Sequence, residues 1–114
     1  MNDWRELKTM VKALGDVIRL TIVYYLARQE EITVSMLTEK LGLSQPLASW
    51  HLRKLRRAGM IHTRRAGRQV YCSLNRTRYQ ECLQRLHLLV DASVQIETLP
   101  SGEALIEAEA WPDE

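Results

Sequence analysis

The chain has 114 residues, 46% of them hydrophobic, which is enough for one small folded domain and too little for two independent ones. No stretch approaches the roughly 18 uncharged apolar residues that a membrane span needs, and the polar opening lacks the apolar stretch of a signal peptide. We therefore expect a cytoplasmic protein with reduced cysteines. The net charge of +2 conceals a strong separation of charge along the chain.

Charge is distributed unevenly along the chain. Residues 1–96 hold all 16 lysines and arginines but only 8 of the 14 acids, whereas residues 97–114 hold six acids and no cation. Between Glu39 and Glu81 there is no acid at all, yet there are ten cations. Such clustering suits a polyanion, because each neutralised phosphate releases condensed counterions, whereas a merely solvated surface interleaves both signs. Residues 1–96 are therefore predicted to form a nucleic-acid-binding domain, and residues 97–114 a flexible acidic tail.

Two helices are predicted at the start of the chain. Apolar residues recur there at steps of three and four, which is the period of an amphipathic helix, and Gly15 can end it. The apolar stripe of this helix consists of Trp4, Leu7, Val11 and Leu14. Asp16 can cap a second helix over 17–27, which is apolar on most sides and is expected to be enclosed by the rest of the fold.

A helix-turn-helix is predicted in the middle of the chain. A short third helix can begin at Thr33 or Ser35 and end at Gly42, and Ser44 can cap a fourth helix. The three-residue turn between them has the spacing of a motif whose second helix enters the major groove of DNA.

The fourth helix has two faces of different chemistry. At 100° per residue, the side expected to pack inward carries Ala48, His51, Leu52 and Leu55. The opposite side is expected to face DNA and carries Pro46, Ser49, Trp50, Arg53 and Arg57. Lys54 and Arg56 lie on the flanks, where long cations reach the phosphates that border the groove.

A β-hairpin is predicted after the fourth helix, because two short β-like runs, Met60–Arg65 and Gln69–Leu74, surround Gly67. Alternation along the second run places Val70, Cys72 and Leu74 on one face, which can lean on the helices. The tip of the hairpin is expected to contact the DNA backbone or a neighbouring minor groove through Arg64, Arg65 and Arg68.

A last helix of about five turns is predicted from Thr77 onward, with an apolar stripe through Ile96. So long a terminal helix has little of its own domain to cover it, so we expect it to pair with the first helix across a two-fold axis. The predicted dimer interface comprises Trp4, Leu7, Val11, Tyr79, Cys82, Leu86, Leu89 and Ser93. The acidic tail beyond Pro100 is expected either to solubilise the protein or to compete weakly with DNA for the basic residues.

The run LSQPLASWHLRKLRRAGMI, from Leu43 to Ile61, closely resembles the recognition-helix signature of the ArsR/SmtB family of bacterial repressors. The opening of the family's second helix is similar to Ala13-Leu14-Gly15-Asp16 with Arg19-Leu20 in this chain. The family's wing is similar to Arg65-Ala66-Gly67-Arg68 with Tyr71 and Leu74. The resemblance covers residues 5–96 and implies a mainly α fold with a small β-hairpin, a winged helix-turn-helix that dimerises through its first and last helices. It further implies a homodimer that binds an inverted-repeat operator in double-stranded DNA and usually represses transcription until an effector releases it.

The resemblance also assigns roles to residues of the fourth helix. It implies that Gln45, Ser49, Trp50 and Arg53 read bases, although packing of Trp50 against a neighbouring helix explains that residue nearly as well. His51 is expected to be structural or to bond a phosphate. The predicted DNA-binding residues are Ser44, Gln45, Pro46, Ser49, Trp50, Arg53, Lys54, Arg56, Arg57, Arg64, Arg65 and Arg68.

The sequence leaves the effector open. Metal sensors of the family place paired cysteines on the third helix, or Asp and His on the last, and this chain offers only Cys82, His87 and Asp91, without the full spacing. Thiol sensors link two cysteines, so Cys72 and Cys82 are the candidate thiol sensor, with Cys72 expected to be buried and Cys82 the more reactive. A constitutive repressor fits as well, and we expect no metal or cofactor.

An enzymatic function is excluded by the absence of a Gly-rich phosphate loop, a Gly-x-Ser-x-Gly elbow and a His-Glu-x-x-His motif. Two other functions remain as alternatives: a winged-helix adaptor whose basic face binds an acidic protein, and a metal-responsive repressor that uses the last helix. RNA is disfavoured as a ligand because the aromatics that stack bases on a sheet surface are missing.

Overall fold

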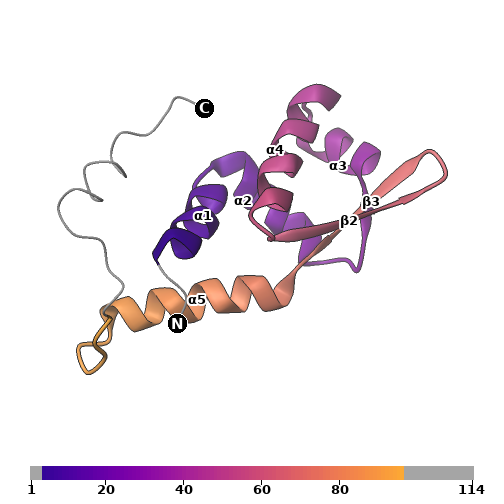
Figure 1. Cartoon of the computed structure of the whole chain (residues 1–114). Coiled ribbons are helices and arrows are strands. Elements are labelled where there is room, and N and C mark those ends of the chain that lie inside the picture. The colour runs from indigo at the N-terminus through magenta and orange to yellow at the C-terminus, as the bar shows by residue number, and fades with distance from the viewer. Residues whose placement is uncertain (1–3, 97–114) are drawn as a thin grey trace.

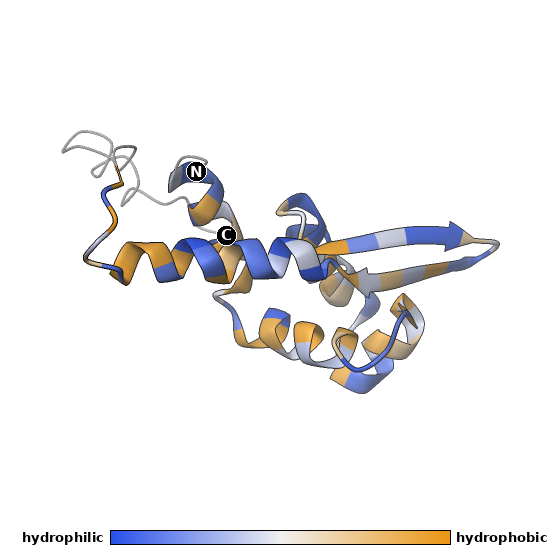
Figure 2. Ribbon diagram, turned by 90° about the horizontal axis from the view of Figure 1, so that it is seen from below, coloured by the Kyte–Doolittle hydropathy of each residue, from blue (hydrophilic) through white to orange (hydrophobic). Residues whose placement is uncertain are grey.

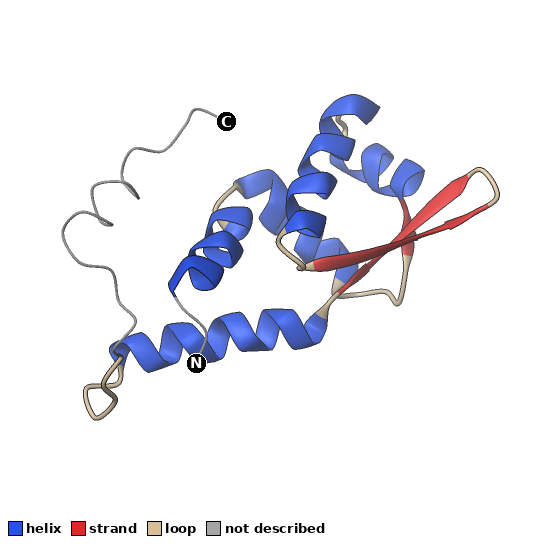
Figure 3. Ribbon diagram, in the orientation of Figure 1, coloured by secondary structure: helices blue, strands red, loops and turns tan. Residues whose placement is uncertain are grey.

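The computed structural model describes residues 4–96, which form five helices and a three-stranded antiparallel sheet (Figures 1 and 3). The elements in chain order are α1 Trp4–Leu14, α2 Val17–Leu26, β1 Ile32–Thr33, α3 Val34–Leu41, α4 Gln45–Arg57, β2 Ile61–Ala66, β3 Gln69–Leu74 and α5 Arg76–Val90. The fold is a winged helix-turn-helix, as predicted. The predicted acidic tail over 97–114 lies outside the described residues.

The helix starts follow from capping side chains that the sequence made visible. The side chains of Asp16, Thr33 and Ser44 accept hydrogen bonds from backbone N–H groups in the first turns of α2, α3 and α4. Gly42 ends α3 in the left-handed region at φ 67°, where a residue without Cβ carries no steric penalty. These contacts confirm the predicted three-residue turn between α3 and α4.

The core lies between the five helices and the sheet. Its fully buried side chains include Ile22, Leu37, Leu55 and Met60. Within its own chain, α1 buries Leu7, Met10 and Ala13, while Val11 of the predicted apolar stripe is exposed. Because α1 packs on α2, α4 and α5 at once, its buried face is broader than one stripe and includes Met10 and Ala13, which the stripe omitted.

The sheet forms the wing and has the strand order β1-β3-β2. The pairing of Ala66 with Gln69 leaves a two-residue loop whose first residue, Gly67, has φ 62°, as in a type II′ hairpin turn. Sequence reasoning missed β1, which is only two residues long and exists through its pairing with Tyr71 and Cys72, far away in the chain. In Figure 1 the β2–β3 hairpin projects well beyond the helices.

The last helix is shorter than predicted, because α5 ends at Val90 and not near Ile96. The Asp91 side chain accepts hydrogen bonds from both the backbone N–H and the hydroxyl of Ser93. These bonds stabilise a turn in place of a further turn of helix. These bonds also lower the pKa of Asp91, with the hydroxyl bond the larger cause. Ser93 therefore lies outside the helix and not on its apolar stripe, whereas its predicted place in a dimer interface stays a prediction.

In the part of the chain from 4 to 96, no helix is long and apolar enough to cross a membrane.

Candidate nucleic-acid interface

The recognition helix α4 presents the two faces that its sequence predicted. Ala48, His51, Leu52 and Leu55 are buried against the core, which confirms the inward face. The first turn from Ser44 to Leu47 is exposed, and its Leu47 N–H is capped by the Ser44 hydroxyl. Arg53, Arg56 and Arg57 are exposed farther along the helix.

A basic groove of about 380 Å³ joins α4 to the wing. Six of the twelve predicted DNA-binding residues line it: Gln45, Ser49, Arg53, Arg56, Arg65 and Arg68. None of these four arginines has an ion-pair partner within residues 4–96. The groove also includes Thr63 and Gln69, which sequence reasoning missed. Alternation along β2 was the available signal, because Thr63 and Arg65 are two residues apart and therefore share a face.

The same alternation separates two arginines that the sequence analysis grouped together. Arg64 lies on the opposite face of β2 from Arg65 and donates two hydrogen bonds of 2.7 Å to the Glu31 carboxylate. Its guanidinium also lies 4.4 Å from the centre of the Tyr71 ring. The hydrogen bonds from Arg64 hold the pKa of Glu31 below its ordinary value. Arg64 is thus bound to the base of the wing and does not line the basic groove.

Trp50 is half-buried, and two cations lie close to its ring. The Lys54 ammonium lies 4.8 Å and the Arg19 guanidinium 5.9 Å from the centre of the indole ring, and the His51 ring packs edge-on against it at 4.9 Å. These contacts favour the packing role that the sequence left open, and Trp50 does not line the basic groove, while base reading by Trp50 stays a prediction.

The C-terminal end of α4 is held by a cluster of charges from α1 and α5. Arg78 donates from Nε to the Ala58 carbonyl and from Nη1 to the Glu6 carboxylate, and Arg85 Nη1 lies 2.9 Å from the same carboxylate. These bonds from Arg85 and Arg78 lower the pKa of Glu6. Asn75 adds a hydrogen bond to the Gly59 carbonyl. The end of the recognition helix is therefore coupled to α1 and α5.

The predicted interface residues fall into two groups. Leu7 and Cys82 are buried in the core of their own chain, and Tyr79 packs against that core. The expectation that these residues need a partner chain in order to be buried is therefore wrong. Val11, Leu86 and Leu89 are exposed, and Trp4 is half-buried. The outward side of α5 also carries apolar residues that the stripe omitted, namely Leu83 and Val90, and Figure 2 shows apolar segments along this helix.

The two thiols are buried, and neither forms a disulfide. Burial raises the pKa of Cys72 to about 11, in agreement with its predicted inertness. Burial also raises the pKa of Cys82, although Arg78 and Arg85 act in the opposite direction. Within residues 4–96 no three His, Cys, Asp or Glu side chains are grouped so that they could hold a metal ion.

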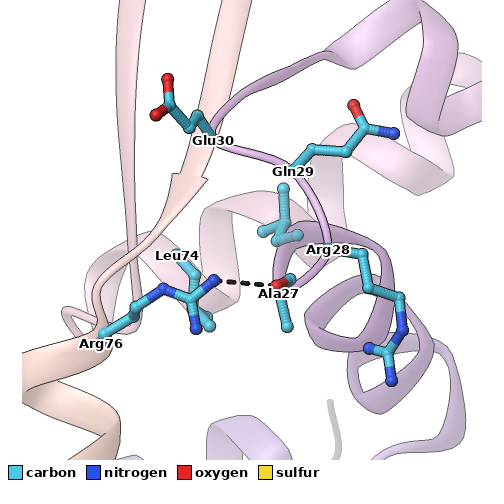
Figure 4. Close-up of a pocket in the computed structure, with 7 residues that line it drawn as sticks. Ala27, Arg28, Gln29, Glu30, Leu74 and Arg76 are labelled. Carbon is cyan, nitrogen blue, oxygen red and sulfur yellow. Dashed lines mark hydrogen bonds between the residues drawn. The ribbon is translucent and has the colours of Figure 1, made fainter.

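A second cavity, of about 420 Å³, lies where the end of α2 approaches the start of α5 (Figure 4). Arg76 donates a 2.8 Å hydrogen bond to the Ala27 carbonyl there. Arg28 donates to the Tyr24 carbonyl and lies 3.6 Å from the centre of the Tyr24 ring. Both cations that line the cavity are thus already engaged, so the basic groove is the better candidate site.

A helix-turn-helix with a basic groove shared by its second helix and a wing defines a winged-helix regulator of the DNA-binding class. The sequence model of the bacterial regulatory protein, arsR family, matches residues 16–63, and the chain belongs to that family. The members are transcriptional regulators, which confirms the prediction that the chain is not an enzyme.

Three known proteins illustrate the relationship. The arsenic resistance transcriptional regulator ArsR1 of Pseudomonas putida is 42% identical over 74 residues, which are 62% of this chain and 58% of that protein. The transcriptional activator HlyU of Vibrio cholerae is 35% identical over 80 residues, or 70% of this chain and 73% of that protein. The crystal structure of the repressor BigR from Xylella fastidiosa is 28% identical, covers 77% of this chain and 89% of its own, and superposes with a TM-score of 0.60.

Proposed function

We propose that the protein is a homodimeric repressor that binds an inverted-repeat operator through α4 and the wing. The observation that carries the proposal is the basic groove, in which unpaired arginines from α4 and from the hairpin lie on one surface beside the polar side chains of Gln45 and Ser49. Arginines and amides can read base edges in the major groove, while cations at a wing neutralise phosphates. A dimer seated across a promoter excludes other proteins from it, so repression is the expected effect.

Dimerisation is expected because exposed leucines and Val90 on α5, together with Val11 on α1, are apolar side chains that a second copy can cover. At micromolar concentration the chain should sediment at about twice its mass of 13.3 kDa. Leu86→Glu should shift it to the monomer, because a carboxylate would be buried without a partner. Met36→Glu is the matched control, since Met36 is also exposed, at 48% against 38% for Leu86, but lies on α3. A wild-type mass near one chain would contradict the proposal.

DNA recognition is tested with three arginine variants, after selection of bound sequences from a random duplex pool identifies the operator. Arg53→Ala should reduce discrimination against the wrong base by about 1–3 kcal/mol. Arg65→Ala should weaken all duplexes alike and lower the slope of log affinity against log salt by about 1. Arg64→Ala is the control and should change binding least, because this guanidinium is bound to Glu31. Equal losses on operator and random DNA for Arg53→Ala would contradict base reading.

The operator is expected to contain two half-sites about 10 to 11 base pairs apart, or a multiple of that spacing, as two recognition helices of a dimer require. Release by a thiol-directed effector stays a prediction from the sequence, and the burial of both Cys72 and Cys82 does not favour it. The protein-adaptor alternative predicts little salt-dependent binding to random duplex, so the same salt series distinguishes it from the proposal.

A further inference from the structure

Two ionisable side chains are buried where the recognition helix meets the rest of the domain. Arg19 of α2 is 3% exposed and His51 of α4 is 4% exposed. Side chains of this kind are seldom buried to such a degree unless their polar atoms have partners. Neither residue lines the basic groove, so a direct contact with DNA is not the reason that these two side chains occupy this site.

Arg19 joins three helices. Its Nε donates a 2.6 Å hydrogen bond to the Ala13 carbonyl in the last turn of α1, and its Nη1 donates a 3.0 Å hydrogen bond to Nδ1 of His51. Its own backbone N–H donates to the Asp16 carboxylate that caps α2. Because a guanidinium can only donate, Nδ1 of His51 must accept, which places the imidazole proton on Nε2. The contact therefore exists only with a neutral imidazole.

We propose that Arg19 and His51 position the recognition helix, and that they do so only while His51 is neutral. The proposal rests on the proposed function, because α4 is the helix that would read DNA. A proton on Nδ1 would remove the acceptor and place two positive charges 3.0 Å apart in a site shielded from water. The contact between α2 and α4 would then break, and Ser49 and Arg53 on the opposite side of α4 would leave their place in the basic groove.

The charged groups around His51 favour its neutral form. Burial is the main cause that lowers the pKa of His51 from its ordinary value of 6.5, Asp16 acts in the opposite direction, and Arg19 and Lys54 lower the pKa further. Asp16 Oδ2 lies 3.7 Å from Nδ1. These groups belong to the start of α2 and to α4 itself, and within residues 4–96 no titratable side chain of α1, α3 or β2 acts on His51. Because the folded-state pKa is lowered, the contact is fully stabilising above pH 6.5 and is lost as the pH falls through the folded-state pKa.

A titration of the full chain without DNA tests the positioning role independently of the proposed function. Nitrogen-detected NMR of His51 should show the Nε2–H form at pH 7.5. The backbone amides of α4 should then shift with the same midpoint as the His51 ring when the pH falls, at pH values where circular dichroism shows the fold intact. Amides of α4 that do not follow the ring, or global unfolding with the same midpoint, would overturn the proposal.

DNA binding supplies a second test, in which the sign of the effect is informative. Acidification makes the chain more positively charged, so simple electrostatics predicts tighter binding to DNA at lower pH. The proposal predicts the reverse, with affinity for the selected operator falling up to about tenfold for each pH unit below the pKa of His51, the limit for one proton. Absence of any duplex binding at pH 7.5 would refute the proposed function, and the DNA-free titration would still decide the positioning role.

Two variants separate the hydrogen bond from the bulk of the side chain. His51→Asn places an amide oxygen near the position of Nδ1 and does not titrate, so it should keep operator binding at pH 7.5 and lose the decline at low pH. His51→Gln places its amide one bond farther out, so it should bind more weakly at every pH. His62→Asn is the control and should keep the wild-type decline. Equal affinity and an equal pH profile for wild type and His51→Gln would overturn the proposal.

Discussion

Replacing Leu55 with alanine should lower the free energy of unfolding by about 2–5 kcal/mol, which is a large part of the total stability of a domain of this size. Leu55 is fully buried and is one of the residues by which α4 packs on the core. Truncation removes its transfer free energy and leaves a cavity among neighbours that α4 cannot close without moving its DNA-facing side. A fall in operator affinity should therefore accompany the loss of stability.

Leu47→Ala is the matched control, because it makes the same change in the same helix at a side chain that is 40% exposed. Its effect should stay below about 1 kcal/mol, since little burial is lost. Urea unfolding at a fixed protein concentration measures both variants, and the concentration must be equal because dimerisation contributes to apparent stability. Similar losses for the two variants would contradict the packing assigned to α4.

Replacing Glu6 with glutamine should lower the free energy of unfolding by about 1–3 kcal/mol. Its carboxylate is the shared counterion of Arg78 and Arg85, and Arg85 is only 9% exposed. Removing one partner of a buried ion pair costs about 3–5 kcal/mol, and the 29% exposure of Glu6 reduces that figure. Because Arg78 also holds the Ala58 carbonyl, the variant should loosen the end of the recognition helix as well.

The contribution of Glu6 to the free energy of unfolding should depend on pH. The pKa of Glu6 is lowered from 4.5 in the folded chain, so its contribution is complete above pH 4.5 and is lost as the pH falls through the lowered value. The stability difference between wild type and Glu6→Gln should therefore be constant near neutral pH and shrink in acid. Glu81→Gln is the control, because Glu81 is 42% exposed and lies 3.7–3.8 Å from the same two arginines. Its effect should stay below about 0.5 kcal/mol at every pH.

The sequence by itself determined the helices, the turn between α3 and α4, and the two faces of α4. Each depends on interactions between residues three or four positions apart, such as the Thr33 and Ser44 caps and the periodic burial of Ala48, Leu52 and Leu55. The basic character of the interface was also readable, because no acid interrupts the cations between Glu39 and Glu81.

The tertiary structure alone decided which polar groups meet across the fold. The partners of the Arg19–His51 and Glu31–Arg64 contacts lie 32 and 33 positions apart in the chain, and those of the Glu6–Arg78 contact lie 72 apart. No periodic signal predicts such pairs, because a charged side chain reads the same whether it is solvated or bound to a distant partner. The strand β1 and the burial of Cys82 belong to the same class, since each depends on an element far away in the sequence.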